Sequence, residues 1–214
     1  MYSLIPFLTY YLQRFDRTNA SAVADNVIHQ LDLLWTHCRQ NTTGLLVHGY
    51  DASPADRKAS WANPVTGASP FAWSRSLGWY FISLIDALEI VAGAKDVFPE
   101  NLELYLRSRF VELAGAVARA ADTETGCWWQ VMEYPRRDRN YIESSGSPMF
   151  TYGLYKGVRL GYLPQTSKKN STDIAEKCYR YLVDHFVVDN KNGTLGYNGT
   201  VGVCSLNSSA TYEV

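Results

Sequence analysis

The chain has 214 residues, of which 46% are hydrophobic and 19% are charged. A chain of this kind can form one globular domain with a hydrophobic core, and intrinsic disorder is excluded. With 20 Lys and Arg against 21 Asp and Glu, the charge favours neither a nucleic-acid partner nor an acidic tail, and no apolar run indicates a membrane partner.

Hydrophobic residues recur at helical spacing along most of the chain. This spacing predicts amphipathic helices. In chain order they cover roughly residues 4–16, 23–38, 70–93, 102–117, 145–161 and 174–186. Pro6 and Pro70 suit the first turn of a helix, so they place the starts of the first and third helices.

A similar loop follows every second predicted helix. The three loops begin at Asn41, Asp122 and Asn190, and each runs through Thr and Gly residues into a short strand-like stretch. A unit of helix, helix, turn and short strand that recurs about every 70–80 residues is typical of solenoids and closed toroids. The sequence therefore predicts an all-α fold, an (α/α)6-type toroid of helical hairpins. About half of the ring is expected, as a single partial domain over residues 1–214.

Both ends of the chain have the look of internal sequence. Met1 leads directly into an apolar helix and not into the charged region of a signal peptide, and the closing residues Ala-Thr-Tyr-Glu-Val include no helix cap. We therefore expect the natural protein to be longer than this chain at both ends, with any signal peptide outside it.

The cysteines and asparagines bear on the cellular compartment. The four cysteines lie far apart without CxxC spacing, which argues against a metal site and leaves one or two disulfides open; they are Cys38, Cys127, Cys178 and Cys204. Six asparagines stand in Asn-x-Ser/Thr, namely Asn19, Asn41, Asn170, Asn192, Asn198 and Asn207. This excess favours a secreted, glycosylated protein. The alternative is a cytoplasmic protein in whose loops Ser, Thr and Asn simply crowd together.

His48 is the first candidate for chemistry. Alternation along the short strand at residues 45–51 puts His48 and Tyr50 on one side. A histidine three residues before Asp51 can transfer a proton or bind a substrate hydroxyl. The alternative is a histidine that only ties down the loop.

Arg75 and Trp79 form the second candidate. Four residues apart on a helix, they share a face. A guanidinium fork can bind a sugar carboxylate while the indole stacks on the sugar ring. The alternatives are a cation–π pair, or a core tryptophan under an arginine that reaches to solvent.

The third candidate lies between the fourth and fifth helices, where Trp129 and Gln130 stand in an aromatic run. Gln130 and Glu133 can bind hydroxyls, whereas Ser144, after Glu143, is placed as a natural helix N-cap. The chain is rich in aromatic residues, at 14%. They suit a sugar-binding cleft, because ring faces stack on the C–H face of a pyranose, but they suit a core equally well.

Taken together and in order, six segments resemble the unsaturated rhamnogalacturonyl hydrolases, glycoside hydrolase family 105. They are Met-Tyr-Ser-Leu-Ile-Pro-Phe-Leu, Thr-Gly-Leu-Leu-Val-His-Gly-Tyr-Asp, Trp-Ala-Asn-Pro with Thr-Gly-Ala-Ser-Pro, Trp-Ser-Arg-Ser-Leu-Gly-Trp-Tyr, Trp-Gln-Val, and Tyr-Ile-Glu-Ser-Ser-Gly-Ser-Pro-Met-Phe. The resemblance covers the chain from residue 1 nearly to its end. It implies a six-hairpin α/α barrel that hydrolyses small oligosaccharides carrying an unsaturated uronic acid, without cofactor or metal.

The resemblance also implies a mechanism and assigns residues to it. In the family an aspartate protonates the C4=C5 bond of a terminal 4-deoxy uronic acid from pectin, and water adds at C5. That aspartate would precede Met1, so the chain itself is expected to be inactive. His48 matches the histidine beside the double bond, and Arg75 and Trp79 match the residues that hold the uronate carboxylate. The remaining residues expected to bind substrate are Asp51, Trp129 and Gln130. The alternatives are a sugar-binding relic or truncated gene product without turnover, and a polysaccharide lyase on the same toroid.

Overall fold

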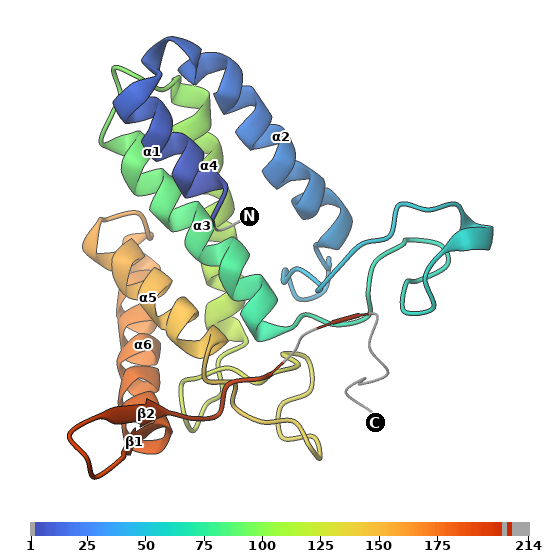
Figure 1. The fold of residues 1–214 in the computed structure, drawn as a ribbon, viewed down its shortest axis with the longest axis vertical. Helices are drawn as coiled ribbons and strands as arrows, with labels where there is room; N and C mark the ends of the chain where they lie inside the picture. Colours follow the sequence, from blue (N-terminus) through green and yellow to red (C-terminus); the bar gives the residue numbers. More distant parts are fainter. Residues whose placement is uncertain (1–2, 203–204, 207–214) are drawn as a thin grey trace.

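The computed structural model describes residues 3–202, 205 and 206 of the chain. These residues form the helices α1 (Ile5–Phe15), α2 (Ala20–Cys38), α3 (Ser74–Ala92), α4 (Glu100–Arg119), α5 (Gly146–Arg159) and α6 (Gln165–Phe186) (Figure 1). Two short 3-10 turns, η1 (Arg17–Asn19) and η2 (Ala55–Arg57), and the antiparallel hairpin of β1 (Val187–Asp189) and β2 (Leu195–Tyr197) complete the elements. None of these helices is long and apolar enough to cross a membrane.

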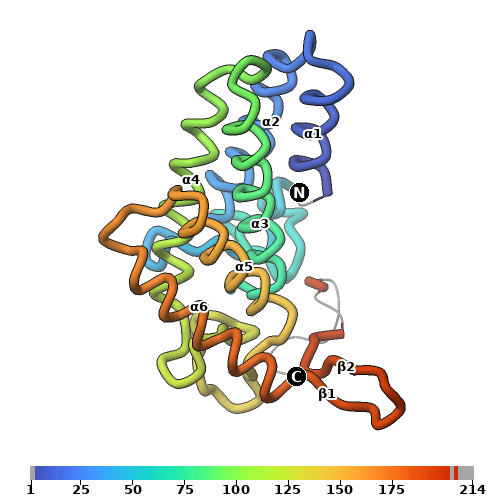
Figure 2. The backbone as a smooth tube through the Cα atoms, turned by 90° about the vertical axis from the view of Figure 1, so that its left-hand side faces the viewer, coloured from blue at the N-terminus to red at the C-terminus, as the bar shows by residue number. Residues whose placement is uncertain are grey.

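The helices are arranged as consecutive hairpins in two layers. α1, α3 and α5 lie side by side, α3 and α5 each pack against the helix that follows them, and α2, α4 and α6 form a second layer (Figures 1 and 2). This arrangement of three hairpins confirms the all-α, toroid-type fold that the loop repeat predicted.

The core lies between these layers and is densest around α3. Because α3 is flanked by α1, α4 and α5, apolar side chains are buried on most of its circumference. α5 approaches closely because Gly153 and Gly157 face the rings of Phe81 and Phe110, which stack on each other at 5.2 Å. A side chain at either glycine would push the two hairpins apart.

The predicted starts of the third and sixth helices were wrong. The sixth begins at Gln165 and not near Ile174, because its first turns are polar and the apolar pattern does not mark them. The third helix begins at Ser74 and not near Pro70, because Trp73, the residue before it, is held in an extended conformation. Trp73 bridges Val131 in antiparallel fashion, and the Ser74 N–H donates to the Gln130 carbonyl at 3.0 Å. Backbone pairing with a distant loop therefore overrides the helical pattern at Pro70.

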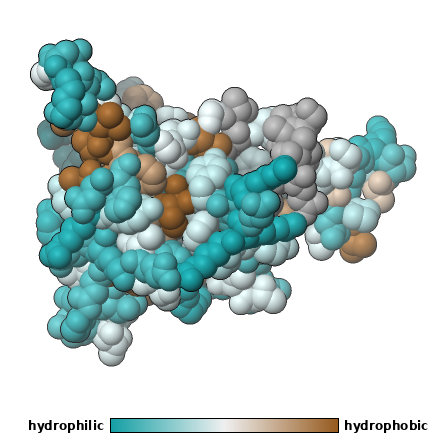
Figure 3. Space-filling model, turned by 90° about the horizontal axis from the view of Figure 1, so that it is seen from below, coloured by the Kyte–Doolittle hydropathy of each residue, from teal (hydrophilic) through white to brown (hydrophobic). Residues whose placement is uncertain are grey.

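Three long loops gather at one end of the helices and form what we call the loop face, residues 39–73, 120–145 and 187–202 (Figure 1). The predicted repeat is visible in their turns. Gly44 and Gly126 take positive φ angles of 78° and 73°, and their N–H groups bond to the Gln40 and Asp122 carbonyls. Seen from this end, the surface is mostly hydrophilic with isolated hydrophobic side chains (Figure 3).

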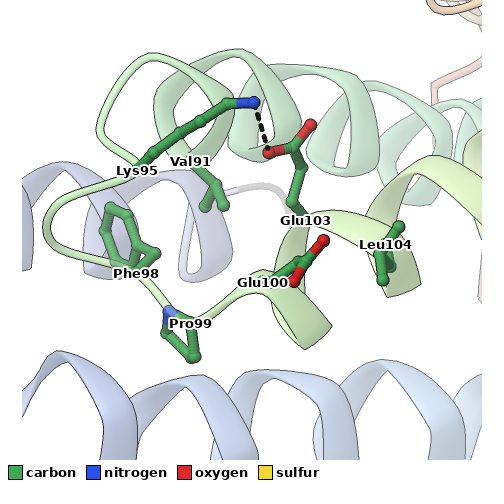
Figure 4. A pocket seen from close by; sticks show the side chains of 7 residues that line it. All are labelled: Val91, Lys95, Phe98, Pro99, Glu100, Glu103 and Leu104. Atoms are coloured by element: carbon green, nitrogen blue, oxygen red, sulfur yellow. Dashed lines mark ion pairs between the residues drawn. The ribbon is translucent and has the colours of Figure 1, made fainter.

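A pocket of about 220 Å³ lies elsewhere, between the end of α3 and the start of α4. Its walls are Val91, Phe98, Pro99, Glu100 and Leu104, together with Lys95 and Glu103, whose side chains point toward each other across an ion pair of 3.7 Å (Figure 4). None of the predicted sugar-binding residues lines this pocket.

The outer side of α1 carries a row of exposed aromatic residues. Phe7, Tyr11 and Phe15 stand four residues apart with ring centroids 6.0 and 5.5 Å from one another, and Phe15 is 73% exposed. A contiguous apolar face of this kind usually marks a contact surface or an aggregation risk.

We therefore expect the isolated chain to self-associate at modest concentration, and the double variant Phe7→Ser, Phe15→Ser to be more monomeric in sedimentation velocity. Val65→Ser is the control, because Val65 is even more exposed than Phe7 and Phe15 but lies in a loop away from α1. A wild-type chain that is monomeric with a sharp thermal transition would contradict this prediction.

Candidate functional site

Isolated backbone hydrogen bonds and bridges join extended segments of the loop face to one another. The His48 N–H donates to the Phe71 carbonyl at 3.0 Å, Trp73 bridges Val131, and Trp129 bridges Ile142. The segments that carry His48, Arg75, Gln130 and Glu143 are therefore consecutive neighbours, although they lie up to about a hundred residues apart in sequence.

His48 is stacked on an aromatic side chain. Its imidazole lies 4.2 Å from the Trp73 ring at an interplanar angle of 21°. This stacking fixes the plane of the imidazole on the loop face. Trp73 was not among the predicted site residues, although it opens the segment that also contains Arg75 and Trp79. The predicted helix began near Pro70 and therefore included Trp73, whereas in the structure Trp73 precedes the helix.

Asp51 holds its own loop in place. One carboxylate oxygen accepts the Ser53 N–H at 2.8 Å and the other accepts the Ala59 N–H at 2.7 Å. These hydrogen bonds, with Ala59 first, lower the pKa of Asp51 to about 2. The structure thus gives Asp51 a clear role in shaping residues 51–59, while its predicted contact with substrate stays a prediction.

Because the folded pKa of Asp51 lies below its ordinary value of 3.8, the carboxylate stabilises the fold above that value and loses this effect as the pH falls toward 2. We expect Asp51→Ala to lower the Tm at neutral pH, and the difference from wild type to shrink between about pH 4 and 2. Thermal unfolding across this range tests it; a difference that is constant with pH would contradict it.

Arg75 stands at the start of α3 and is anchored there. Its Nε donates to the Ser145 hydroxyl at 2.7 Å, its Nη2 donates to the Val201 carbonyl, and Nη2 lies 3.8 Å from a Glu143 carboxylate oxygen. Trp79, one turn further along α3, is 41% exposed. The two predicted carboxylate-binding residues therefore lie one turn apart on the same helix, with the indole exposed and the guanidinium anchored.

Glu143 is fully buried and caps α5. Its carboxylate accepts N–H groups from Ser145 at 3.1 Å, Gly146 at 2.6 Å and Val201 at 3.1 Å. A serine, Ser145, does occupy the N-cap position, but it makes no side-chain cap bond, and the Ser144 hydroxyl bonds to residues 198 and 200 instead. A carboxylate at the first turn of a helix satisfies the same N–H groups and also suits the helix dipole.

The third candidate segment is held by backbone and carboxylate bonds. Gln130 is buried, with its N–H bonded to the Tyr141 carbonyl at 2.8 Å, and the Trp129 indole N–H donates to Asp122 at 3.1 Å. Burial favours the neutral acid at Asp122. Hydrogen bonds from Thr125, Trp129 and the Glu124 N–H outweigh burial and lower its pKa.

Glu133 differs from the other carboxylates of the loop face. It accepts the Ala72 N–H at 2.9 Å, yet burial dominates and raises its pKa above the ordinary value. From the sequence, Glu133 was expected only to bind hydroxyls. Burial favours the protonated acid at Glu133, in contrast to Asp51 and Asp122, and only its buried position reveals this.

A disulfide joins the loop face to α6. Cys127 and Cys178 are bonded across 51 residues, whereas Cys38 is buried and reduced; Cys204 lies outside the described residues. The sequence left the pairing open. The structure places one of the possible bridges between the turn after α4 and the middle of α6.

Comparisons with known proteins agree with this architecture. A family model, Glycosyl Hydrolase Family 88, matches residues 2–214. The curated Protein Atu3128 of Agrobacterium fabrum is 36% identical over 163 residues, which are 76% of this chain and 66% of that protein. The 24.9 kDa protein in the picA locus of Rhizobium radiobacter gives the same figures.

Two solved structures extend the comparison. A family 105 glycoside hydrolase from C. acetobutylicum is 32% identical with a TM-score of 0.81, over 97% of this chain and 54% of that one. A possible family 105 member from Salmonella enterica is 26% identical with a TM-score of 0.61, over 83% of this chain and 42% of that one. The chain thus spans about half the length of these solved relatives. It belongs to glycosyl hydrolase family 88, and the resemblance to family 105 that its motifs indicated is confirmed.

Proposed function

We propose that this protein hydrolyses oligosaccharides that carry an unsaturated uronic acid at the non-reducing end, with rhamnogalacturonan fragments of pectin as substrate. The observation that carries the proposal is the pairing of Arg75 with the exposed Trp79 on α3, within a family match over residues 2–214. A guanidinium beside an open indole suits an anionic sugar, because one group binds the carboxylate and the other stacks on the ring.

The chemistry needs one proton and one water molecule. The proton adds to C4 of the C4=C5 bond, the hydroxyl of water adds to C5, and the remaining proton of that water restores the acid. The hemiketal formed at C5 then opens and releases the next sugar. His48, with its ring fixed against Trp73, is proposed to lie beside the double bond, while Arg75 holds the carboxylate attached to C5. Asp51, Trp129 and Gln130 are proposed to bind the rest of the substrate.

Substitution of Arg75 by Lys tests the binding role. In calorimetric titration with an unsaturated uronic acid disaccharide, Arg75→Lys is expected to lose about 1–3 kcal/mol of binding free energy, because a lysine ammonium does not reproduce the planar guanidinium that bonds to Ser145 and Val201 and still has an N–H group for the uronate. Arg109→Lys is the control, since Arg109 is similarly buried but lies on α4, bonded to Asp32. Unchanged affinity in Arg75→Lys would contradict the proposal.

Two other functions make different predictions. A sugar-binding relic would bind the disaccharide and leave its double bond intact in every form of the protein. A polysaccharide lyase would create C4=C5 bonds, so the absorbance of a saturated polymer would rise, whereas a hydrolase of unsaturated sugars makes this absorbance fall. The sign of the change separates these classes.

We also propose that the protein is secreted and N-glycosylated. The five described sequon asparagines are exposed, namely Asn19, Asn41, Asn170, Asn192 and Asn198, while Asn207 lies outside the described residues. The disulfide supports an oxidising compartment. Expression in a eukaryotic secretory host should give a product whose mass falls on treatment with peptide N-glycosidase; an unmodified product would contradict this.

A further inference from the structure

Arg75 is held at two points of its guanidinium by groups from distant parts of the chain. The Ser145 hydroxyl, at the start of α5, accepts Nε at 2.7 Å, and the Val201 carbonyl accepts Nη2. A planar group fixed at Nε and Nη2 has only one orientation. The side chain therefore does not need to be ordered when a ligand arrives, which lowers the entropic cost of binding.

Glu143 is the group on which this arrangement depends. A fully buried carboxylate is costly unless its oxygens are satisfied. Here three backbone N–H groups and the Ser145 hydroxyl, at 2.9 Å, satisfy it, and Arg75 adds a charge 3.8 Å away. Since the Ser145 hydroxyl has one proton, it donates to Glu143 and so presents a lone pair to Arg75.

We propose that Ser145 and Glu143 are positioning residues for the substrate carboxylate. Glu143 orients the Ser145 hydroxyl, and that hydroxyl holds the Arg75 guanidinium so that its Nη1 group meets the uronate. The inference rests on the proposed function, in which Arg75 binds the carboxylate. It adds two residues that do not touch the substrate but set the selectivity of the binding site for an acid over a neutral sugar.

The neighbouring serine provides a matched control. The Ser144 hydroxyl donates to the Asn198 carbonyl at 2.6 Å and shares a hydrogen bond with Thr200 at 2.8 Å. Its N–H donates to the Gly199 carbonyl at 3.2 Å. Ser144 thus fastens residues 198–200 to the start of α5 by bonds that do not involve Arg75.

The test compares two ligands, an unsaturated uronic acid disaccharide and its methyl ester, titrated into the 214-residue chain by calorimetry. Ser145→Ala is expected to weaken binding of the acid about tenfold and to change binding of the ester little, so that the ratio of the two affinities narrows. Ser144→Ala should lower the Tm and leave this ratio as in wild type. Ser145→Thr, which keeps the hydroxyl, should restore the ratio.

An unchanged ratio in Ser145→Ala, or an equal change in both alanine variants, would overturn the inference. If Ser145→Ala does not fold, Ser145→Cys replaces it, because a thiol is a weaker acceptor of the same shape, and an intermediate ratio is then expected. A wild-type chain that binds acid and ester equally would refute the proposed carboxylate site itself, and the inference with it. If wild type prefers the acid to the ester and Ser145→Ala does not change this preference, only the inference is refuted and the proposed function stands.

Discussion

Removal of the Cys127–Cys178 disulfide is expected to lower the free energy of unfolding by about 2–4 kcal/mol. The bond closes a loop of 51 residues that contains all of α5. It also fastens α6 to the turn at Gly126, where a Cβ atom would lie only 2.9 Å from the Ile174 carbonyl and the Cys178 nitrogen. Without the bond, the third hairpin is held to the others by packing and by polar contacts such as those of Lys156 with Asp86 and Glu89, both at 2.6 Å.

Urea unfolding of the double variant Cys127→Ser, Cys178→Ser, and of wild type with and without a reductant, measures this effect. Cys38→Ala is the control, because it keeps the disulfide and should lose stability in the reductant as wild type does. Equal stability of oxidised and reduced wild type would contradict the prediction.

The 214-residue chain itself is expected to hydrate unsaturated disaccharides several powers of ten more slowly than a form extended to the full fold of the C. acetobutylicum relative, of which it covers 54%. Protonation of carbon needs a positioned acid that keeps its proton. Two carboxylates of the loop face, those of Asp51 and Asp122, each accept two backbone N–H groups, and these bonds lower their pKa.

Glu133 is the described carboxylate whose raised pKa would suit such an acid. If the chain does show turnover, Glu133→Gln is therefore the first variant to make, followed by His48→Ala. Turnover by the wild-type chain that is abolished in Glu133→Gln would overturn the expectation and assign the acid to this residue. The rate is followed by the absorbance of the C4=C5 bond.

The fold was largely predictable because its helices bury regular apolar faces. The predicted helix boundaries were wrong where polar residues extend a helix, as in α6, and where backbone pairing with a distant segment replaces helical structure, as before α3. The first two turns of α6, from Gln165, are mostly polar, so the pattern placed that helix only from Ile174. The residues from Pro70 to Trp73 suit a helix locally, but Trp73 forms a backbone bridge to Val131 instead.

The candidate site was predictable in its residues and not in their connections. Arg75 and Trp79 share a face because they are four apart on a helix, which the sequence states directly. The partners of Arg75 lie 70 and 126 residues away, at Ser145 and Val201, and nothing local marks them. The cap of α5 was assigned to Ser144, because serine is a usual N-cap residue, but the buried Glu143 accepts the N–H group of Gly146 there.

The most direct measurement of the proposed function is the absorbance of the C4=C5 bond of an unsaturated rhamnogalacturonan disaccharide. It is followed with this chain and with a form extended by the part of the fold that the C. acetobutylicum relative has in addition. The proposal predicts a steady loss of absorbance with the extended form, release of the second sugar, and at least a tenfold slower loss in its Arg75→Lys variant. Persistence of the double bond with the extended form, while the disaccharide is bound, would contradict it and leave a sugar-binding protein.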